Sequence, residues 1–153
     1  MSQPLDYPSK TARFALPLLF SGQAQKEFTV NEAISRIAAL LHASVEAERA
    51  EPPTVPPDGQ CWLVAPAATG AWEGRDGSIA TYAAGDWLFV EPLPGLRCHD
   101  LSTGATLLFD DGWRRVGAPA LPIGGSVRDE EARTSIAELL SALGELGILP
   151  SAA

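Results

Sequence analysis

Four prolines between residues 50 and 57 divide this chain into two parts that follow different patterns. Proline fixes φ and removes a backbone donor, so the run Ala-Glu-Pro-Pro-Thr-Val-Pro-Pro can neither continue a helix nor serve as a central strand. Before this run, apolar residues recur at helical spacing, and after it short apolar runs are separated by Gly and Asp turns. The sequence therefore predicts an α+β fold, in which a small antiparallel β-hairpin meander over about residues 58–118 is flanked by an N-terminal helix and a C-terminal helix.

The N-terminal helix is predicted over residues 29–45. Thr29 and Glu32 have the spacing of a capping box, in which each side chain satisfies a free amide at the helix start. The apolar residues that follow recur at intervals of three and four and form one stripe: Val30, Ile34, Ile37, Leu41 and Val45. We expect this stripe to pack on the core or on a partner.

The C-terminal helix is predicted to begin near Asp129, with Ser126 as a possible cap, and to end at Gly147. Its apolar face consists of Ile136, Leu139, Leu140, Leu143 and Leu146. A second Pro- and Gly-containing segment, at residues 119–125, separates this helix from the β region. The helix therefore either docks on its own chain or serves in oligomerisation.

The β region contains a weak internal repeat. Residues 79–90 and 105–116 each read as a strand, a tight turn containing Gly, and a second strand with Trp near its start. This pattern predicts two β-hairpins.

Three segments follow from these elements: an extended N-terminal arm (1–21), a helix and β-meander domain (22–118), and a linker with the C-terminal helix (119–153). The arm contains an apolar run at residues 14–20, which can cover its own core or contact a neighbouring subunit. A dense polar cluster at residues 22–27 follows, and its amides can satisfy the backbone of a chain that changes direction. The possible assembly contacts are Phe14, Leu16, Leu18, Leu19, Phe20, Gln23, Gln25, Lys26, Glu27, Ile136, Leu140 and Leu143.

Charge and composition argue against several classes of partner. The 153 residues carry a formal net charge of −8, and the 11 basic residues are scattered rather than gathered in a patch. We therefore expect no direct nucleic-acid partner. No apolar run approaches the roughly 20 residues of a spanning helix, so membrane insertion is not expected. Cys61 and Cys98 are too few for a disulfide scaffold; they can pair, although buried thiols are expected in a reducing cytoplasm.

The sequence predicts no catalytic residue, cofactor or metal site. Cys98 and His99 are neighbours on a predicted strand, so their side chains point to opposite faces and cannot act together. Five carboxylates lie in predicted turns, where Asp and Gly occur for backbone reasons: Glu73, Asp76, Asp86, Asp110 and Asp111. A glycosidase acid–base pair or a calcium site built from them are the alternatives.

Three tryptophans leave a binding function open. Trp72, Trp87 and Trp113 can stack on sugar rings as a carbohydrate-binding module, or they can pack in the core and across strands.

Several blocks of the chain resemble a family of phage tail-fibre and gene-transfer-agent proteins that contains a domain of unknown function. The blocks are Leu16-Pro-Leu-Leu-Phe20, Gly22-Gln-Ala-Gln-Lys-Glu27, Asn31-Glu-Ala33, Gly59-Gln-Cys-Trp62-Leu-Val64, Ala68-Thr-Gly-Ala-Trp72 and Gly85-Asp-Trp87-Leu-Phe-Val90. Together they cover about residues 14–117, and the first blocks are quite specific. In longer relatives a fibre or receptor-binding segment follows this domain, whereas here the sequence ends soon after it.

The resemblance implies a structural component of a phage-like particle, most like the base of a head spike in a gene transfer agent. The implied partners are capsid or tail proteins, a spike or fibre protein, and further copies of the chain. A pentamer would match a capsid vertex and a trimer would match a fibre. The implied location is the cytoplasm during assembly and then the released particle.

Overall fold

The computed structural model of the chain describes residues 10–11, 16, 18–19, 26–122, 125 and 128–150. Among these residues two α-helices, one short 3-10 helix (Gly70–Trp72) and eight strands form, which confirms the α+β class. The helices are α1 (Lys26–Leu40) and α2 (Glu130–Glu145). The strands are β1 (Ser44–Val45), β2 (Glu48–Arg49), β3 (Cys61–Val64), β4 (Ile79–Ala83), β5 (Asp86–Val90), β6 (Arg97–Asp100), β7 (Ala105–Phe109) and β8 (Trp113–Arg114).

The strands form two four-stranded sheets with the same arrangement. One sheet has the order β2-β3-β4-β5 and the other has the order β1-β6-β7-β8. In each, a two-residue edge strand pairs in parallel with the first strand of a three-stranded antiparallel meander. Both hairpins predicted from the repeat are confirmed, as β4–β5 and β7–β8. The single antiparallel meander expected over residues 58–118 is instead divided, and its parallel edges come from the chain just after α1.

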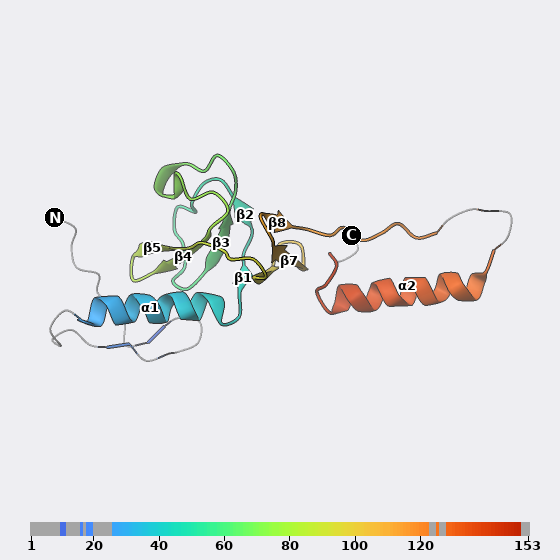
Figure 1. The fold of residues 1–153 in the computed structure, drawn as a ribbon, viewed down its shortest axis with the longest axis horizontal. Helices are drawn as coiled ribbons and strands as arrows, with labels where there is room; N and C mark the ends of the chain where they lie inside the picture. The colour runs from blue at the N-terminus through green and yellow to red at the C-terminus, as the bar shows by residue number, and fades with distance from the viewer. Residues whose placement is uncertain are drawn as a thin grey trace.

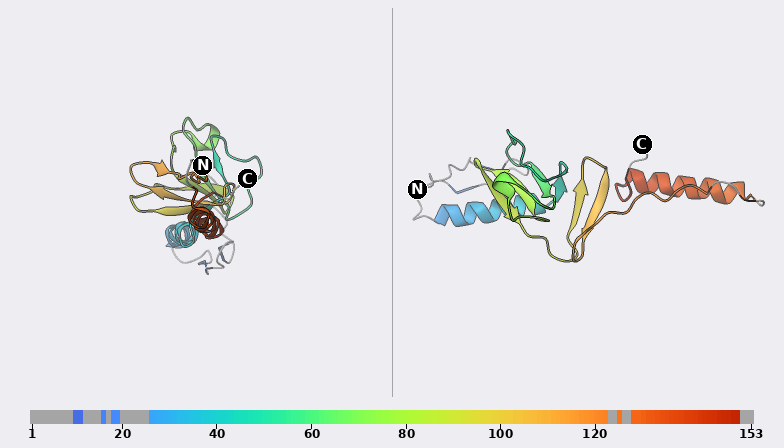
Figure 2. Two further views of the ribbon diagram at one scale, coloured as in Figure 1. Left: turned by 90° about the vertical axis from the view of Figure 1, so that its right-hand side faces the viewer. Right: turned by 90° about the horizontal axis from the view of Figure 1, so that it is seen from above.

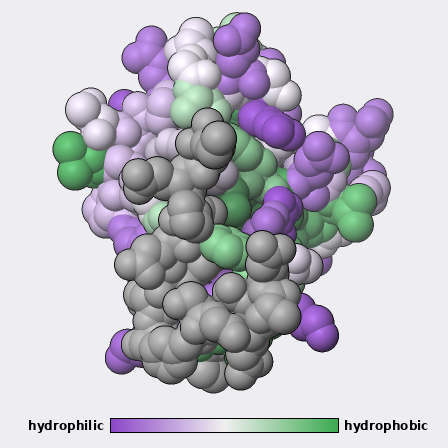
Figure 3. Space-filling model, turned by 90° about the vertical axis from the view of Figure 1, so that its left-hand side faces the viewer, coloured by the Kyte–Doolittle hydropathy of each residue, from purple (hydrophilic) through white to green (hydrophobic). Residues whose placement is uncertain are grey.

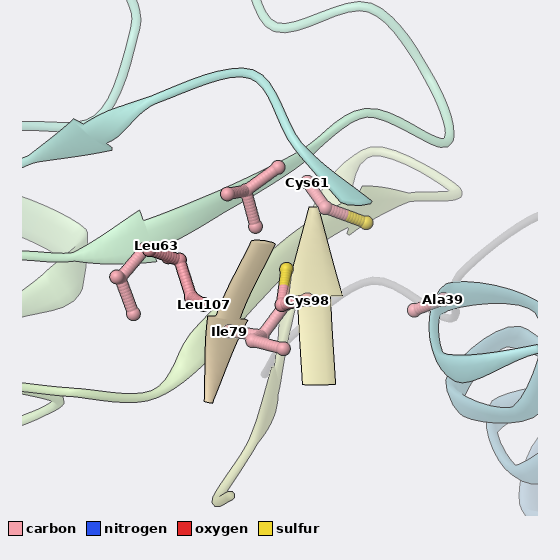
Figure 4. Close-up of a cluster of buried hydrophobic side chains, with 7 residues drawn as sticks. Ala39, Cys61, Leu63, Ile79, Cys98 and Leu107 are labelled. Carbon is pink, nitrogen blue, oxygen red and sulfur yellow. The ribbon is translucent and has the colours of Figure 1, made fainter. Parts of the chain in front are cut away.

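The main core lies between the two sheets and is closed at one side by α1. Cys61, Leu63 and Ile79 of one sheet meet Cys98 and Leu107 of the other, and Ala39 of α1 contacts the same cluster. Figure 4 shows these side chains directed toward one another. Cys61 and Cys98 are both buried in this core and form no disulfide with each other.

Helix α1 differs from its prediction in both its bounds and its orientation. It begins at Lys26, so Thr29 lies inside the helix and the predicted capping box is wrong. It ends at Leu40 rather than at residue 45, because Ser44 and Val45 pair with β6.

The face that α1 buries carries small and polar residues, namely Asn31, Ser35, Ala38 and Ala39. This face packs against β4 and β5, since short side chains let the helix lie close to the sheet. Most of the predicted apolar stripe points away from the sheets, with Val30, Ile37 and Leu41 exposed, whereas Ile34 is half-buried and Val45 is buried in β1.

Helix α2 projects from the sheets. The chain leaves β8, runs outward in extended form over residues 115–122, and returns as α2 beside that segment (Figure 1). The two further views show α2 extending along the long axis of the molecule, away from the sheets (Figure 2). The predicted start near Asp129 is confirmed, and Asp129 itself caps the helix by accepting a hydrogen bond of 2.9 Å from the Ala132 amide. Ser126, the residue expected as a cap, lies outside the described residues. No residue of α2 is buried.

Candidate assembly surface

The N-terminal arm is attached to α1 by one buried amide side chain. Asn31 accepts a hydrogen bond of 2.8 Å from the Leu19 amide and donates one of 2.9 Å to the Leu19 carbonyl. Its side chain is 1% exposed, and the neighbouring Leu18 is buried. Asn31 therefore satisfies both backbone groups of Leu19. The role predicted for the amides at residues 22–27 stays a prediction, because Gln23 and Gln25 lie outside the described residues.

The other predicted contacts in the arm fall partly inside the described structure. Leu16 is half-buried, and its amide donates to the Thr11 hydroxyl at 3.0 Å, while the Thr11 amide donates to the Leu16 carbonyl at 2.9 Å. Lys26 and Glu27 are the first two residues of α1, and Lys26 is exposed. Phe14, Phe20, Gln23 and Gln25 lie outside the described residues.

The outer face of α1 presents apolar side chains to solvent. Val30, Ile37, Leu40 and Leu41 lie along it, and Leu41 is 58% exposed. Figure 3 views the molecule from the left-hand side of Figure 1 and shows hydrophobic surface between hydrophilic side chains at the height of the sheets. Clustered exposed apolar side chains of this kind mark protein-contact surfaces more often than single ones do.

Helix α2 presents a second set of apolar side chains. Of the three predicted contacts, Ile136 is exposed, while Leu140 and Leu143 are half-buried. The half-burial of Leu140 comes from the extended segment beside it. A groove of about 410 Å³ separates the two and is lined by Ala118, Pro119, Leu121, Ala137, Leu140 and Gly144, among others.

The C-terminal end of α2 docks on the β1-β6-β7-β8 sheet. Gly147 has φ +66, and the Gly147 and Ile148 amides donate to the Gly144 and Leu143 carbonyls, both at 2.9 Å. These bonds form a Schellman motif, which confirms Gly147 as the end of the helix. The Thr106 hydroxyl of β7 donates to the Gly147 carbonyl at 2.6 Å, and Leu149 is buried beyond it.

A charged cluster fixes the direction in which the linker leaves the sheets. The Asp100 side chain, 1% exposed, accepts bonds from the Ser102 amide at 3.0 Å and the Ser102 hydroxyl at 2.6 Å. Arg115 binds Asp100 at 3.3 Å and Glu48 at 2.8 Å. Residues from β2, the end of β6 and the start of the linker are therefore tied at one point.

The three tryptophans proposed for sugar stacking differ in burial: Trp72 is fully buried, whereas Trp87 and Trp113 are half-buried. Trp72 is 0% exposed, and its ring lies 5.0 Å from Trp87 and 6.4 Å from Trp62, measured between centroids. Trp72 is therefore wrong as a sugar-stacking residue, because neither face of its ring is open. Trp113 is half-buried, and its indole donates to the Gly77 carbonyl at 2.8 Å, which joins the two sheets. Trp87 is half-buried beside Tyr82, with centroids 5.1 Å apart.

The five carboxylates predicted in turns lie in three places: the loop after the 3-10 helix (Glu73 and Asp76), the start of β5 (Asp86) and the turn between β7 and β8 (Asp110 and Asp111). Asp76 accepts bonds from the Ala67 and Ala68 amides at 2.9 and 3.2 Å, and Asp86 accepts one from the Trp87 amide at 2.7 Å. Asp110 pairs with Arg114 at 2.6 Å, Asp111 has a positive φ, and Glu73 is exposed at the end of the 3-10 helix. Among the described residues, no group of three His, Cys, Asp or Glu side chains is placed to hold a metal ion.

The remaining candidates for chemistry lie apart from one another. Cys98 is buried in the core, whereas His99 faces the other side of β6 and packs against Gly147. His42 is exposed after α1. Within the described part of the chain, no helix is both long and apolar enough to cross a membrane.

The sequence did not indicate which residues position the linker and α2. Asp100 and Arg115 hold the start of the linker, and the contact between Gly147 and His99 holds the end of α2. Each acts through a partner distant in the sequence, which no local pattern reports. Asn31 did carry a signal, since it belongs to one of the blocks that the family resemblance rests on.

The chain was compared with protein-family models and with curated proteins. No curated protein matches the chain. A family described as "Protein of unknown function (DUF2793)" matches residues 30–114, which include most of α1 and both sheets and make up more than half of the chain. The linker and α2 lie beyond the matched residues. The chain therefore belongs to the DUF2793 family of proteins of unknown function.

Proposed function

We propose that the chain is a structural component of a phage-like particle, an adaptor that attaches a spike or fibre to the capsid or tail for adhesion to the host surface. In the most specific form of the proposal, it is the base of a head spike in a gene transfer agent, present in several copies. Its partners are then capsid or tail proteins and a spike or fibre protein, and its final location is the released particle.

One observation carries the proposal: on or beside both helices, several large apolar side chains are exposed. Ile37 of α1, Leu41 directly after α1 and Leu139 of α2 are exposed, while small residues of α1 pack inward. Side chains of this size gain about 1.5–3 kcal/mol each when fully buried, so a surface of this kind favours association with another protein. The choice of a phage-like particle rests on the resemblance of the blocks at residues 16–20 and 22–27 to phage tail-fibre and gene-transfer-agent proteins.

The test is incorporation into particles. Full-length wild-type chain and an Ile37→Glu variant are each expressed in source cells that lack their own copy, and released particles are separated on a density gradient. We expect the wild type to sediment with nuclease-protected DNA and the major capsid protein, and the variant to be depleted at least tenfold. Glu51→Lys is the control, because Glu51 is an exposed residue outside α1 and α2, and it should incorporate as the wild type does. Absence of the wild-type chain from such particles would overturn the proposal.

A second candidate function is carbohydrate binding through Trp87. This side chain packs against the rings of Trp62, Trp72 and Tyr82 but is only half-buried, so part of it remains exposed. We expect any binding on a glycan array to be lost in Trp87→Ala and kept in Trp113→Phe, which retains an aromatic ring. Lack of binding by the wild type to any glycan, including host capsular polysaccharide, would eliminate this function.

A further inference from the structure

One face of α2, called the seam below, is made of apolar side chains that are mostly exposed. Its apolar residues recur at intervals of four, three, four and three, which is the heptad spacing of a coiled-coil contact: Ala132, Ile136, Leu139, Leu143 and Leu146. Leu139 is 59% exposed and Leu146 is 73% exposed. The extended segment at 118–121 lines a different side of the helix, through Ala137, Leu140 and Gly144.

The charges of α2 are placed away from this seam. The helix carries four carboxylates, at Glu130, Glu131, Glu138 and Glu145, and they lie on the side of the helix opposite the seam. The residues that flank the seam are Arg133, Ser135, Leu140 and Ala142. In a chain of net charge −8, an identical partner is tolerated only where the acidic side chains do not meet. The seam of α2 meets that condition.

The helix also needs a partner for stability. At 16 residues α2 is about 24 Å long, and isolated helices of this length are marginal in water. Its contacts within the chain are the groove beside residues 118–121 and the docking of Gly147 and Leu149. These contacts hold one side and one end of the helix and leave the seam exposed except at Leu143, which is half-buried.

We propose that α2 associates with α2 of a second copy of this chain along the seam formed by Ala132, Ile136, Leu139, Leu143 and Leu146. A heptad seam is matched by another seam of the same period, since each residue fits between residues of the facing helix. The residues that flank the seam include no carboxylate, so two acidic copies can approach. This inference goes beyond the proposed function, because self-association through α2 is independent of whether the chain enters a particle.

The mass of the full-length protein in solution tests the inference. At concentrations of tens of micromolar we expect a multiple of the 16.1 kDa chain. Leu139→Glu places a carboxylate at the middle of the seam and should raise the dissociation constant at least tenfold. Thr134→Glu adds the same charge on the opposite side of α2 and should leave the mass unchanged. A monomeric wild type, or equal masses for wild type and Leu139→Glu, would overturn the inference.

Cross-linking gives a second measurement that does not depend on a destabilised variant. Leu139 lies at the centre of the seam, so cysteines placed there approach one another whether the helices run parallel or antiparallel. We expect Leu139→Cys to form a disulfide-linked dimer under mild oxidation and Thr134→Cys to form none. Equal cross-linking at the two positions would contradict contact through the seam.

Discussion

Gly147 lies directly against His99, so closely that a Cβ atom added at Gly147 would be 2.8 Å from the Cε1 atom of His99. The same glycine has φ +66, a conformation that other residues adopt only with strain. Two independent constraints therefore require glycine at the point where the end of α2 docks on β6 and β7.

Replacement of Gly147 by Ala is expected to release the end of α2. The left-handed backbone alone costs a residue with Cβ about 1–2 kcal/mol, and the contact with His99 adds to this. We expect trypsin cleavage after Arg133, inside α2, to accelerate roughly 5- to 30-fold, because cleavage follows the population of the open form. The thermal unfolding of the two sheets should not change.

Gly144 provides the matched control for that experiment. It lies within α2, and an added Cβ there would have nothing within 4 Å. Gly144→Ala should therefore stabilise the helix by about 0.5–1 kcal/mol and slow the cleavage. Faster cleavage in both variants would contradict a specific role for Gly147.

Asn31→Ala is expected to loosen the N-terminal arm. The substitution removes both hydrogen bonds to Leu19, each of which contributes about 0.5–1.5 kcal/mol. We expect the free energy of unfolding in urea to fall by about 1–3 kcal/mol, and the Leu19 amide to exchange its hydrogen faster. Asn31→Asp keeps an acceptor for the Leu19 amide but cannot donate to the Leu19 carbonyl, so it should not restore the wild-type value.

Arg115→Ala should destabilise the chain more than the same change at the neighbouring Arg114. Arg115 binds the buried carboxylate of Asp100, and hydrogen bonds to charged groups contribute about 1.5–3 kcal/mol. The side chains of Arg114 and Asp110 are 64% and 51% exposed, so their pair should contribute less than about 1 kcal/mol. Denaturant unfolding of both variants measures the difference, and equal losses would count against the cluster at Asp100.

The elements that the sequence predicts correctly are those with local causes. The start of α2 near Asp129 and its end at Gly147 each depend on hydrogen bonds between residues within one or two turns of each other. The repeat at 79–90 and 105–116 holds even in its aromatic pairs, since Tyr82 meets Trp87 and Phe109 meets Trp113 across the two hairpins.

The features that the sequence does not reveal depend on distant partners. Apolar spacing in α1 identifies a stripe, but it does not say whether the stripe faces the sheet. Ser35, Ala38 and Ala39 are the buried residues, because small side chains allow the helix to pack closely on β4 and β5. The edge strands β1 and β2 are two residues long, too short for any periodicity to report.

Ala84→Asn is expected to stabilise the β4–β5 hairpin. Ala84 and Gly85 form its two-residue turn with φ 54 and 84, and a turn with two positive φ values favours Asn-Gly. Asn tolerates this conformation better than Ala, so we expect a gain of up to about 1 kcal/mol in thermal unfolding. The bond from the Ala84 amide to Asp58 involves the backbone and is retained. A lower melting temperature would show that the turn is not of this type in solution.

Ile37→Lys and Ala38→Leu together test which face of α1 is buried. Ile37 is exposed, so a lysine there should change the free energy of unfolding by no more than about 0.5 kcal/mol. Ala38 is buried against the sheet, and a leucine there overpacks the contact at a cost of about 1–3 kcal/mol. If the apolar stripe faced the core, the order of the two losses would be reversed. Denaturant midpoints measured side by side decide between the two orientations, and a small loss at Ile37 means that its side chain is held outward, where a partner can cover it.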